Sequence, residues 1–243
     1  MNVDVLAFGP HPDDVELFCG GTVAKLVHLG RRVGLIDMTR GELGTRGNRE
    51  TRDQEAADAA DILGVDIREN LDMPDGGLNS RDYNQRDIIV QCIRKHRPQL
   101  ILAPEAKDRH PDHKQGMELV AEAVFLANVG KYPSSLERHK TRAVMYYPMW
   151  WHPEPDLIVD VSEFWDVRMK AVRAYQTQFS SDGTPGPDTF LAQPKFIEWV
   201  DGRGSQFGAI IGVKKGEAFT MRLPIPVDDP FELLVNGTGE ANP

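Results

Sequence analysis

The sequence of 243 residues contains 40% hydrophobic and 27% charged residues, a composition that supports a sizeable folded core and excludes a largely disordered chain. Its length fits a single α/β domain, because such folds run to roughly 200–250 residues as one unit. A net charge of −9, without a run rich in Lys and Arg, excludes nucleic acid as a partner.

The first half of the chain alternates short apolar runs with segments of helical periodicity. The apolar runs have the length of strands and lie at residues 3–8, 32–38, 66–71 and 100–103. The helical segments lie at residues 15–27, 51–63, 80–97 and 113–128. Thr51 and Ser80 are predicted to cap two of these helices, and Gly64 and Pro98 mark where they end.

Strands that alternate with helices at this spacing predict βαβ units with right-handed crossovers. We therefore expect an α/β fold, a single-domain, Rossmann-like, doubly wound sheet that is mostly parallel and carries helices on both faces. Residues 143–147 and 157–161 are predicted as strands that extend this sheet, and residues 163–175 and 189–200 as helices. Residues 180–187 are predicted as a loop.

The end of the chain contains proline and little periodicity. We expect one domain over residues 1–223 and a proline-containing tail over residues 224–243. The tail is expected to wrap the surface, to pair with another subunit or to be poorly ordered.

Two features of the sequence indicate the cellular compartment of the protein. Cys19 and Cys92 lie in apolar helical stretches, which indicates buried thiols and fits the reducing cytoplasm. The start of the chain reaches polar residues too soon for a secretory signal, and no apolar run approaches the ~18 residues that cross a bilayer. We expect a cytoplasmic protein without a membrane span.

Polar clusters follow the first and the fourth predicted strand. His11, Asp13 and Asp14 come directly after the first, and residues 109–113, which include His110 and His113, come shortly after the fourth. Ligands of open α/β sheets bind outside the carboxyl ends of the strands, so both clusters are expected to face one crevice.

These side chains suit a catalytic zinc site, which takes three protein ligands and leaves a fourth position for water. His11, Asp14 and His113 supply imidazole and carboxylate ligands for one Zn2+ per chain. Asp13 is the candidate general base, and His110 could stabilise an oxyanion or donate to the leaving amine. Asp112 would not bind the metal but would orient the ring of His110 or of a ligand histidine through a hydrogen bond.

Each cluster alone has a plainer explanation, because an Asp after a strand often only caps a helix. Their joint placement in one βαβ series favours the metal site. The loop at residues 41–47 lacks the ending of a phosphate-binding loop. It is either a solvated surface loop or a polar lid over a sugar or an anionic aglycone, in which Arg46 would clamp a carboxylate. Trp150 either stacks on a sugar, fills a subunit interface or packs in the core.

The HPDD motif at residues 11–14 and the HPDH motif at residues 110–113 resemble those of the LmbE/PIG-L-like superfamily of zinc-dependent N-acetylglucosaminide deacetylases. The run at residues 39–47 and the Arg52-x-x-Glu55 helix start are most similar to the bacillithiol-biosynthesis deacetylases, which act on N-acetylglucosaminyl malate. This resemblance implies the same zinc ligands, the same base and the same role for His110.

The resemblance also implies sugar-binding roles for Glu42, Arg52 and Asp75, and relatives often form homo-oligomers. Several relatives carry a mobile Tyr late in the chain that polarises the amide carbonyl. Residues 203–208 lack a Tyr, so either Ser205 or Gln206 replaces it, or His110 and the metal suffice.

We therefore expect a zinc-dependent hydrolase that removes acetyl from an N-acetylated sugar, a small-molecule substrate. The expected substrate is N-acetylglucosaminyl malate. The alternatives are a deacetylase of another N-acetylated sugar, such as a chitin fragment, or a non-catalytic metal- or sugar-binding protein.

Overall fold

The computed structural model describes residues 2–151, 154–179 and 186–236. Most of the predicted loop at residues 180–187 and the last seven residues of the predicted tail lie outside the described residues. Within the described ranges, no helix is both long and apolar enough to cross a membrane.

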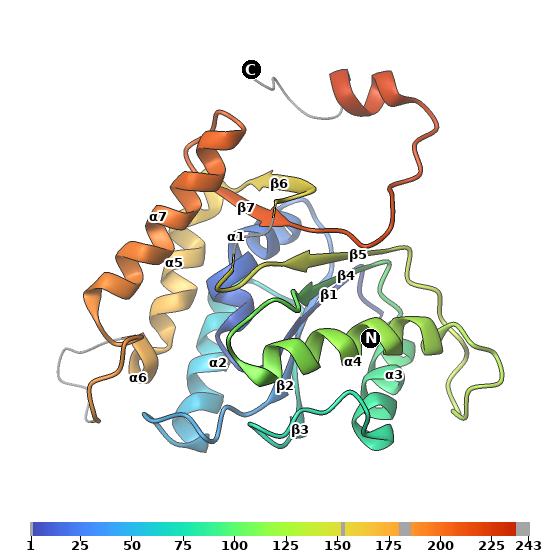
Figure 1. Cartoon of the computed structure of the whole chain (residues 1–243), viewed down its shortest axis with the longest axis horizontal. Helices are drawn as coiled ribbons and strands as arrows, with labels where there is room; N and C mark the ends of the chain where they lie inside the picture. Colours follow the sequence, from blue (N-terminus) through green and yellow to red (C-terminus); the bar gives the residue numbers. More distant parts are fainter. Residues whose placement is uncertain (1, 152–153, 180–185, 237–243) are drawn as a thin grey trace.

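A five-stranded parallel sheet forms the centre of the molecule (Figure 1). Its strands are β1 (Val5–Gly9), β2 (Val33–Thr39), β3 (Ile67–Met73), β4 (Leu100–Pro104) and β5 (Ala143–Tyr147). They lie in the order β3-β2-β1-β4-β5, and each pairs with its neighbour in parallel. Strands β1 and β2 are buried along their whole length, as expected for a sheet covered on both faces.

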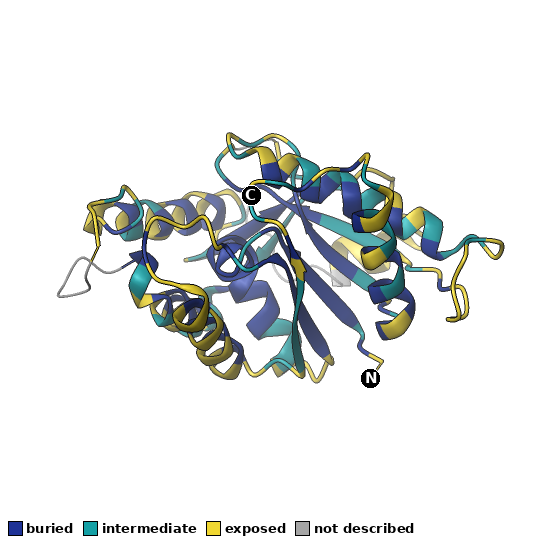
Figure 2. Cartoon of the chain, turned by 90° about the horizontal axis from the view of Figure 1, so that it is seen from below, coloured by how far each residue is buried: buried dark blue, intermediate teal, exposed yellow. Residues whose placement is uncertain are grey.

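Helices cover both faces of the sheet. One face packs against α1 (Asp14–His28), α2 (Arg49–Leu63) and α5 (Trp165–Ala174), and the other against α3 (Tyr83–His96) and α4 (Pro111–Ala127). Alternate residues of β1 point to opposite sides, so Ala7 joins the first core and Leu6 and Phe8 the second. Figure 2 shows the strands buried between helices whose outer sides are exposed. The expected doubly wound α/β fold is confirmed.

The prediction that residues 157–161 extend the main sheet was wrong. This segment forms β6 (Leu157–Asp160), which pairs antiparallel with β7 (Gly216–Phe219) in a separate two-stranded sheet. A buried carboxylate holds β7 elsewhere, because Glu217 accepts hydrogen bonds from the backbone N–H groups of Gly21 and Thr22 at 2.9 and 2.6 Å. The small sheet is therefore fastened to α1, and an isolated antiparallel bridge between Tyr146 and Thr220, just after β7, joins it to the edge strand β5.

Helix boundaries differ in three places. Helix α7 (Pro194–Ile210) begins later than predicted and runs ten residues further. Asn48 caps α2 and Thr51 is its reciprocal partner in a capping box, while Asp82 rather than Ser80 caps α3. Three short helical turns complete the described structure, at Ser162–Phe164, Gln176–Phe179 and Glu232–Asn236.

The strand order creates one crevice. The chain proceeds outward from β1 to β2 and β3, then crosses back over the sheet to β4, which lies on the other side of β1. The connections after β1 and β4 therefore leave in opposite directions at the carboxyl edge, which opens the sheet to a ligand there.

Candidate active site

The loop after β1 makes a tight turn that carries three of the predicted site residues. A Cβ atom on Gly9 would lie only 3.0 Å from the carbonyl oxygen of His11, so the turn needs glycine there. Asp13 stands just before α1 with a φ of 112°, in the left-handed region that non-glycine residues rarely adopt. Strained backbone of this kind concentrates at functional sites.

The second cluster lies at the start of α4. His110 is the N-cap, and its Nδ1 accepts a hydrogen bond from the backbone N–H of Asp112 at 3.3 Å. Pro111 occupies the first turn, where its missing N–H costs nothing. His113 follows one turn later and is buried.

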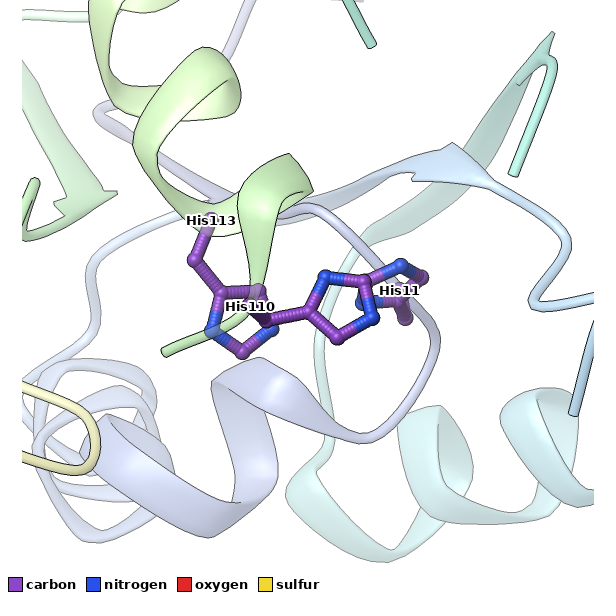
Figure 3. Close-up of side chains that lie close together, drawn as sticks. All are labelled: His11, His110 and His113. Atoms are coloured by element: carbon purple, nitrogen blue, oxygen red, sulfur yellow. The ribbon is translucent and has the colours of Figure 1, made fainter. Parts of the chain in front are cut away.

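These two segments, a hundred residues apart in sequence, meet at the carboxyl edge (Figure 3). Ring nitrogens of His11, His110 and His113 all lie within 4.8 Å of one another. The carboxylate of Asp14 joins them, with Oδ2 3.2 Å from Nδ1 of His11 and Oδ1 3.6 Å from Nε2 of His113. The predicted ligand set is thus brought together.

Further carboxylates contact the ring nitrogen of His11 that does not face Asp14. Nε2 of His11 lies 3.1 Å from Asp75 and 3.4 Å from Asp112, so Asp112 contacts a candidate ligand ring as expected. Asp75, which the resemblance assigned to the sugar, has its carboxylate between His11 and the backbone N–H of Leu43.

Asp108 was missed by the sequence analysis. Its Oδ1 lies 2.9 Å from Nδ1 of His113 and also accepts the backbone N–H of His110 at 2.8 Å, while Oδ2 accepts the backbone N–H of Trp150 at 3.0 Å. The only signal in sequence is a carboxylate two residues before a candidate histidine, and such loop acids are commonly just solvated.

The charges of the cluster are strongly coupled. Burial disfavours a charged His11, but its contacts with Asp112, Asp14 and Asp75 outweigh this and raise its pKa well above the usual range. Burial likewise opposes charge on Asp75, yet the hydrogen bond from His11 lowers its pKa to about 2. The site is therefore an anionic cage around an imidazole.

Burial favours the neutral forms of Asp13 and His110. Burial raises the pKa of Asp13 to about 8, although the nearby guanidinium of Arg52 favours the carboxylate. Burial and the neighbouring His11 and His113 lower the pKa of His110. Asp13 can therefore exchange a proton near neutral pH, whereas His110 favours the neutral imidazole.

Arg52 supports the turn that carries Asp13. Its guanidinium is buried and donates to the backbone carbonyl of Pro12 at 2.6 Å, and it lies 3.5 Å from Oδ2 of Asp13. It also lines the cavity, so the sugar-binding role suggested by resemblance and a positioning role for the turn are compatible.

The site opens into a cavity of about 570 Å3. Asp13, Asp14 and all three histidines line it, together with the cationic side chains of Arg46 and Arg109 and apolar side chains that include Phe18, Trp150 and Leu191. Arg109 lies over the ring of Trp150 at 3.9 Å from its centre. Glu42 is not part of the lining; its carboxylate bonds the backbone N–H groups of Asp75 and Arg40.

Comparison with known proteins agrees with this geometry. The family model described as PIG-L, GlcNAc-PI de-N-acetylase, matches residues 6–124, which run from β1 to α4. Over 193 residues the chain is 33% identical to a diacetylchitobiose deacetylase of Thermococcus kodakarensis, a match that covers 73% of this chain and 71% of that protein. The chain belongs to the PIG-L family.

Other relatives of this PIG-L protein support the assignment. A probable N-acetyl-alpha-D-glucosaminyl L-malate deacetylase 2 of Bacillus cereus is 29% identical over 73% of this chain and 84% of its own length. The solved structure of the conserved protein TT1542 from Thermus thermophilus superposes with a TM-score of 0.85 at 38% identity, covering 94% of this chain and 98% of that one. The relation inferred from the HPDD and HPDH motifs is confirmed.

The late segment with the two candidates to replace the missing Tyr lies outside the cavity lining in this PIG-L protein. Ser205 and Gln206 are exposed on α7 and do not line the cavity. Ser205 bonds the carbonyl of Asp201 and the ammonium of Lys215 instead. Of the alternatives left open by the sequence, the one that relies on His110 and a metal agrees with the geometry.

A divalent cation fits the donor set. Two imidazoles and a carboxylate are the ligands that zinc takes in hydrolases, and their donor atoms face one another within a cage of further carboxylates. Because Asp108 contacts Nδ1 of His113, Nε2 of that ring is the nitrogen turned toward Asp14.

Proposed function

We propose that this protein is a zinc-dependent N-deacetylase that hydrolyses the acetamide of an N-acetylglucosamine conjugate. The observation that carries the proposal is the convergence of His11, Asp14 and His113 with Asp13 and His110 in one cavity. Membership of a family whose named members are deacetylases supports the same reaction class.

His11, Asp14 and His113 would hold the zinc ion. When bound, the ion supplies Lewis-acid chemistry, which polarises a carbonyl and makes water acidic enough to react at neutral pH. The acids behind the ligands, Asp108 and Asp112, would keep the two rings oriented.

Asp13 is the proposed general base. The left-handed turn presents its carboxylate to the cavity, and Arg52 fixes that turn through the carbonyl of Pro12. Asp13 would take a proton from the attacking water and return it to the amine nitrogen as the C–N bond breaks. The products, acetate and the protonated amine, account for all atoms of the amide and the water.

His110 is the proposed partner of the acetyl oxygen. Its Nδ1 accepts the backbone N–H of Asp112, so the neutral ring carries its proton on Nε2. A lowered pKa favours this neutral tautomer, which can donate a hydrogen bond to negative charge that develops on the oxygen.

The cavity favours an anionic aglycone. Arg46 and Arg109 both line it, and guanidinium groups pair well with carboxylates, so we propose N-acetylglucosaminyl malate of bacillithiol biosynthesis as the substrate. The indole of Trp150 in the cavity lining suits a second sugar ring, and the Thermococcus relative is named a diacetylchitobiose deacetylase, so a chitin fragment is the second candidate.

We further propose that the protein acts in the cytoplasm as a homo-oligomer. Cys19 and Cys92 are free and buried thiols, as predicted, which suits a reducing compartment.

The experiment is an assay of acetate release from three substrates: N-acetylglucosaminyl malate, diacetylchitobiose and a neutral methyl N-acetylglucosaminide. We expect the highest kcat/KM on the malate conjugate. A preference for diacetylchitobiose would refute the malate proposal and retain the deacetylase. Zinc-loaded protein that releases no acetate from any of them would favour a non-catalytic binding protein.

A further inference from the structure

The chain beyond β7 begins with a firm attachment. Tyr146 of β5 and Thr220 exchange both backbone hydrogen bonds at 2.9 Å, and the guanidinium of Arg222 lies 4.9 Å from the centre of the Tyr146 ring. From Leu223 onward every residue through Val235 is exposed. We call residues 223–235 the C-terminal arm; Figure 1 shows it leaving the body near β5, with its last helical turn clear of the helices and strands.

The C-terminal arm has an apolar composition that does not suit exposure. Of the seventeen large apolar side chains that are exposed in the described part of the chain, seven lie in these thirteen residues. They are Leu223, Ile225, Val227, Phe231, Leu233, Leu234 and Val235, exposed by 41–77%. Single exposed apolar residues are ordinary, but a contiguous group of this kind marks a contact surface.

The prolines and the charge of the arm limit which class of molecule can bind it. Pro224, Pro226 and Pro230 restrict the backbone, so little conformational entropy is lost when the arm docks. Asp228, Asp229 and Glu232 make it acidic, which disfavours an anionic membrane surface or a nucleic acid. The binding site that suits the arm is therefore an apolar groove on a protein.

The same chain exposes such a groove on the outer side of α3 and α4. Phe125 is 72% exposed there, and Tyr83, whose ring stacks on that of Tyr132, is 50% exposed. Beside Phe125 is a hollow of about 510 Å3, also lined by Ala121, Leu126, Tyr132, Arg86 and Glu122. We call it the α3–α4 groove. It lies at the far end of α4 from His110, outside the active site.

We propose that the C-terminal arm of one copy packs into the α3–α4 groove of a second copy. Both surfaces are exposed on one polypeptide, so every copy supplies one arm and one groove in equal number. The arm is exposed from Leu223 onward, so most of its apolar surface is not covered by its own chain. If two copies insert their arms into each other's grooves, they form a closed symmetric dimer. If each copy inserts its arm into the groove of the next, the copies form a closed ring.

The first test compares molar masses by size-exclusion chromatography with light scattering. The full chain is expected to elute as an oligomer, and both a chain ending at Arg222 and the variant Phe125→Asp should elute at the mass of one chain. Leu29→Asp, which changes an apolar residue that is also exposed but lies elsewhere, should keep the full mass. Circular dichroism checks that each variant is folded.

A full chain that is monomeric at all concentrations, or a truncated chain that keeps the mass of the full one, would overturn the proposal. Deacetylase activity does not enter this readout, so the proposed function can fail while the arm exchange holds, and the reverse.

Cysteine crosslinking tests the pairing itself. Phe231→Cys on one sample and Phe125→Cys on another are mixed and oxidised; the native cysteines are buried. A disulfide-linked pair of chains is expected, and Leu29→Cys in place of Phe125→Cys should give none. A third sample carries both Phe231→Cys and Phe125→Cys on one chain. If only this double variant forms a disulfide, and only within a single chain, the arm packs into its own groove and exchange is excluded.

Discussion

Oδ1 of Asp108 lies 2.9 Å from Nδ1 of His113, while the opposite nitrogen of the same ring lies 3.6 Å from Asp14. One carboxylate thus fixes which nitrogen of His113 faces the candidate metal position. The same Asp108 also accepts backbone N–H groups of His110 and Trp150, so it ties the HPDH segment to the chain that follows β5.

Asp108→Asn is expected to weaken zinc binding about 10- to 100-fold, because an outer partner orients a ligand imidazole and raises its basicity. Competition with a chromogenic chelator measures the affinity. Asp61→Asn, on the exposed side of α2, is the matched control and should bind as the wild type does. Equal affinities for both variants would show that Asp108 does not act through His113.

Asp13→Asn separates catalysis from binding. The substitution replaces the carboxylate of Asp13 by an amide, which cannot act as the proposed base, so kcat is expected to fall by about 10²- to 10⁴-fold. Zinc affinity should change little, because Asp13 is not a proposed ligand. Steady-state acetate release and zinc titration of the same preparation provide the two values. A variant with wild-type kcat would exclude Asp13 as the base.

Zinc binding is expected to release protons. The pKa of His11 is raised well above its usual range, so the ring is protonated at pH 7 in the free protein, whereas a ligand imidazole must be neutral. Affinity should therefore fall as the pH is lowered further below that pKa. Calorimetry in buffers of different ionisation enthalpy counts the protons; a zinc enthalpy independent of the buffer would contradict the prediction.

Arg46→Ala tests the anionic aglycone. Charge-assisted hydrogen bonds contribute roughly 1.5–3 kcal/mol, so KM for the malate conjugate is expected to rise about 10- to 100-fold. KM for the neutral methyl glycoside should stay near the wild-type value. Arg49→Ala, an exposed arginine nearby, is the control. The same rise on both substrates would assign Arg46 to the fold of the loop.

The sequence was informative where chain order alone dictates position. The alternation of apolar runs and helical periods requires a parallel sheet, and in such a sheet the segments after β1 and β4 emerge at one edge. His11 and His113 could therefore be expected to meet although they are far apart in sequence. The restriction to histidine and aspartate made zinc chemistry the natural expectation.

Contacts that depend on a particular distant partner could not be predicted in this way. Nothing in the segment at residues 157–161 reveals that its partner is β7, which is held by a buried Glu217 bonded to α1. Asp108 and Asp75 likewise resemble ordinary loop acids until the fold sets them beside His113 and His11. Periodicity identifies elements, but only the packed structure identifies such pairs.

The most direct test of the metal-centred site is a zinc titration of metal-depleted protein, followed by acetate release from N-acetylglucosaminyl malate and from diacetylchitobiose. The account predicts no activity without metal, a linear rise that reaches its plateau at one zinc per chain, and no recovery in His113→Ala at the same zinc concentrations. Full activity in protein shown to be free of metal, or an unaffected His113→Ala, would contradict it.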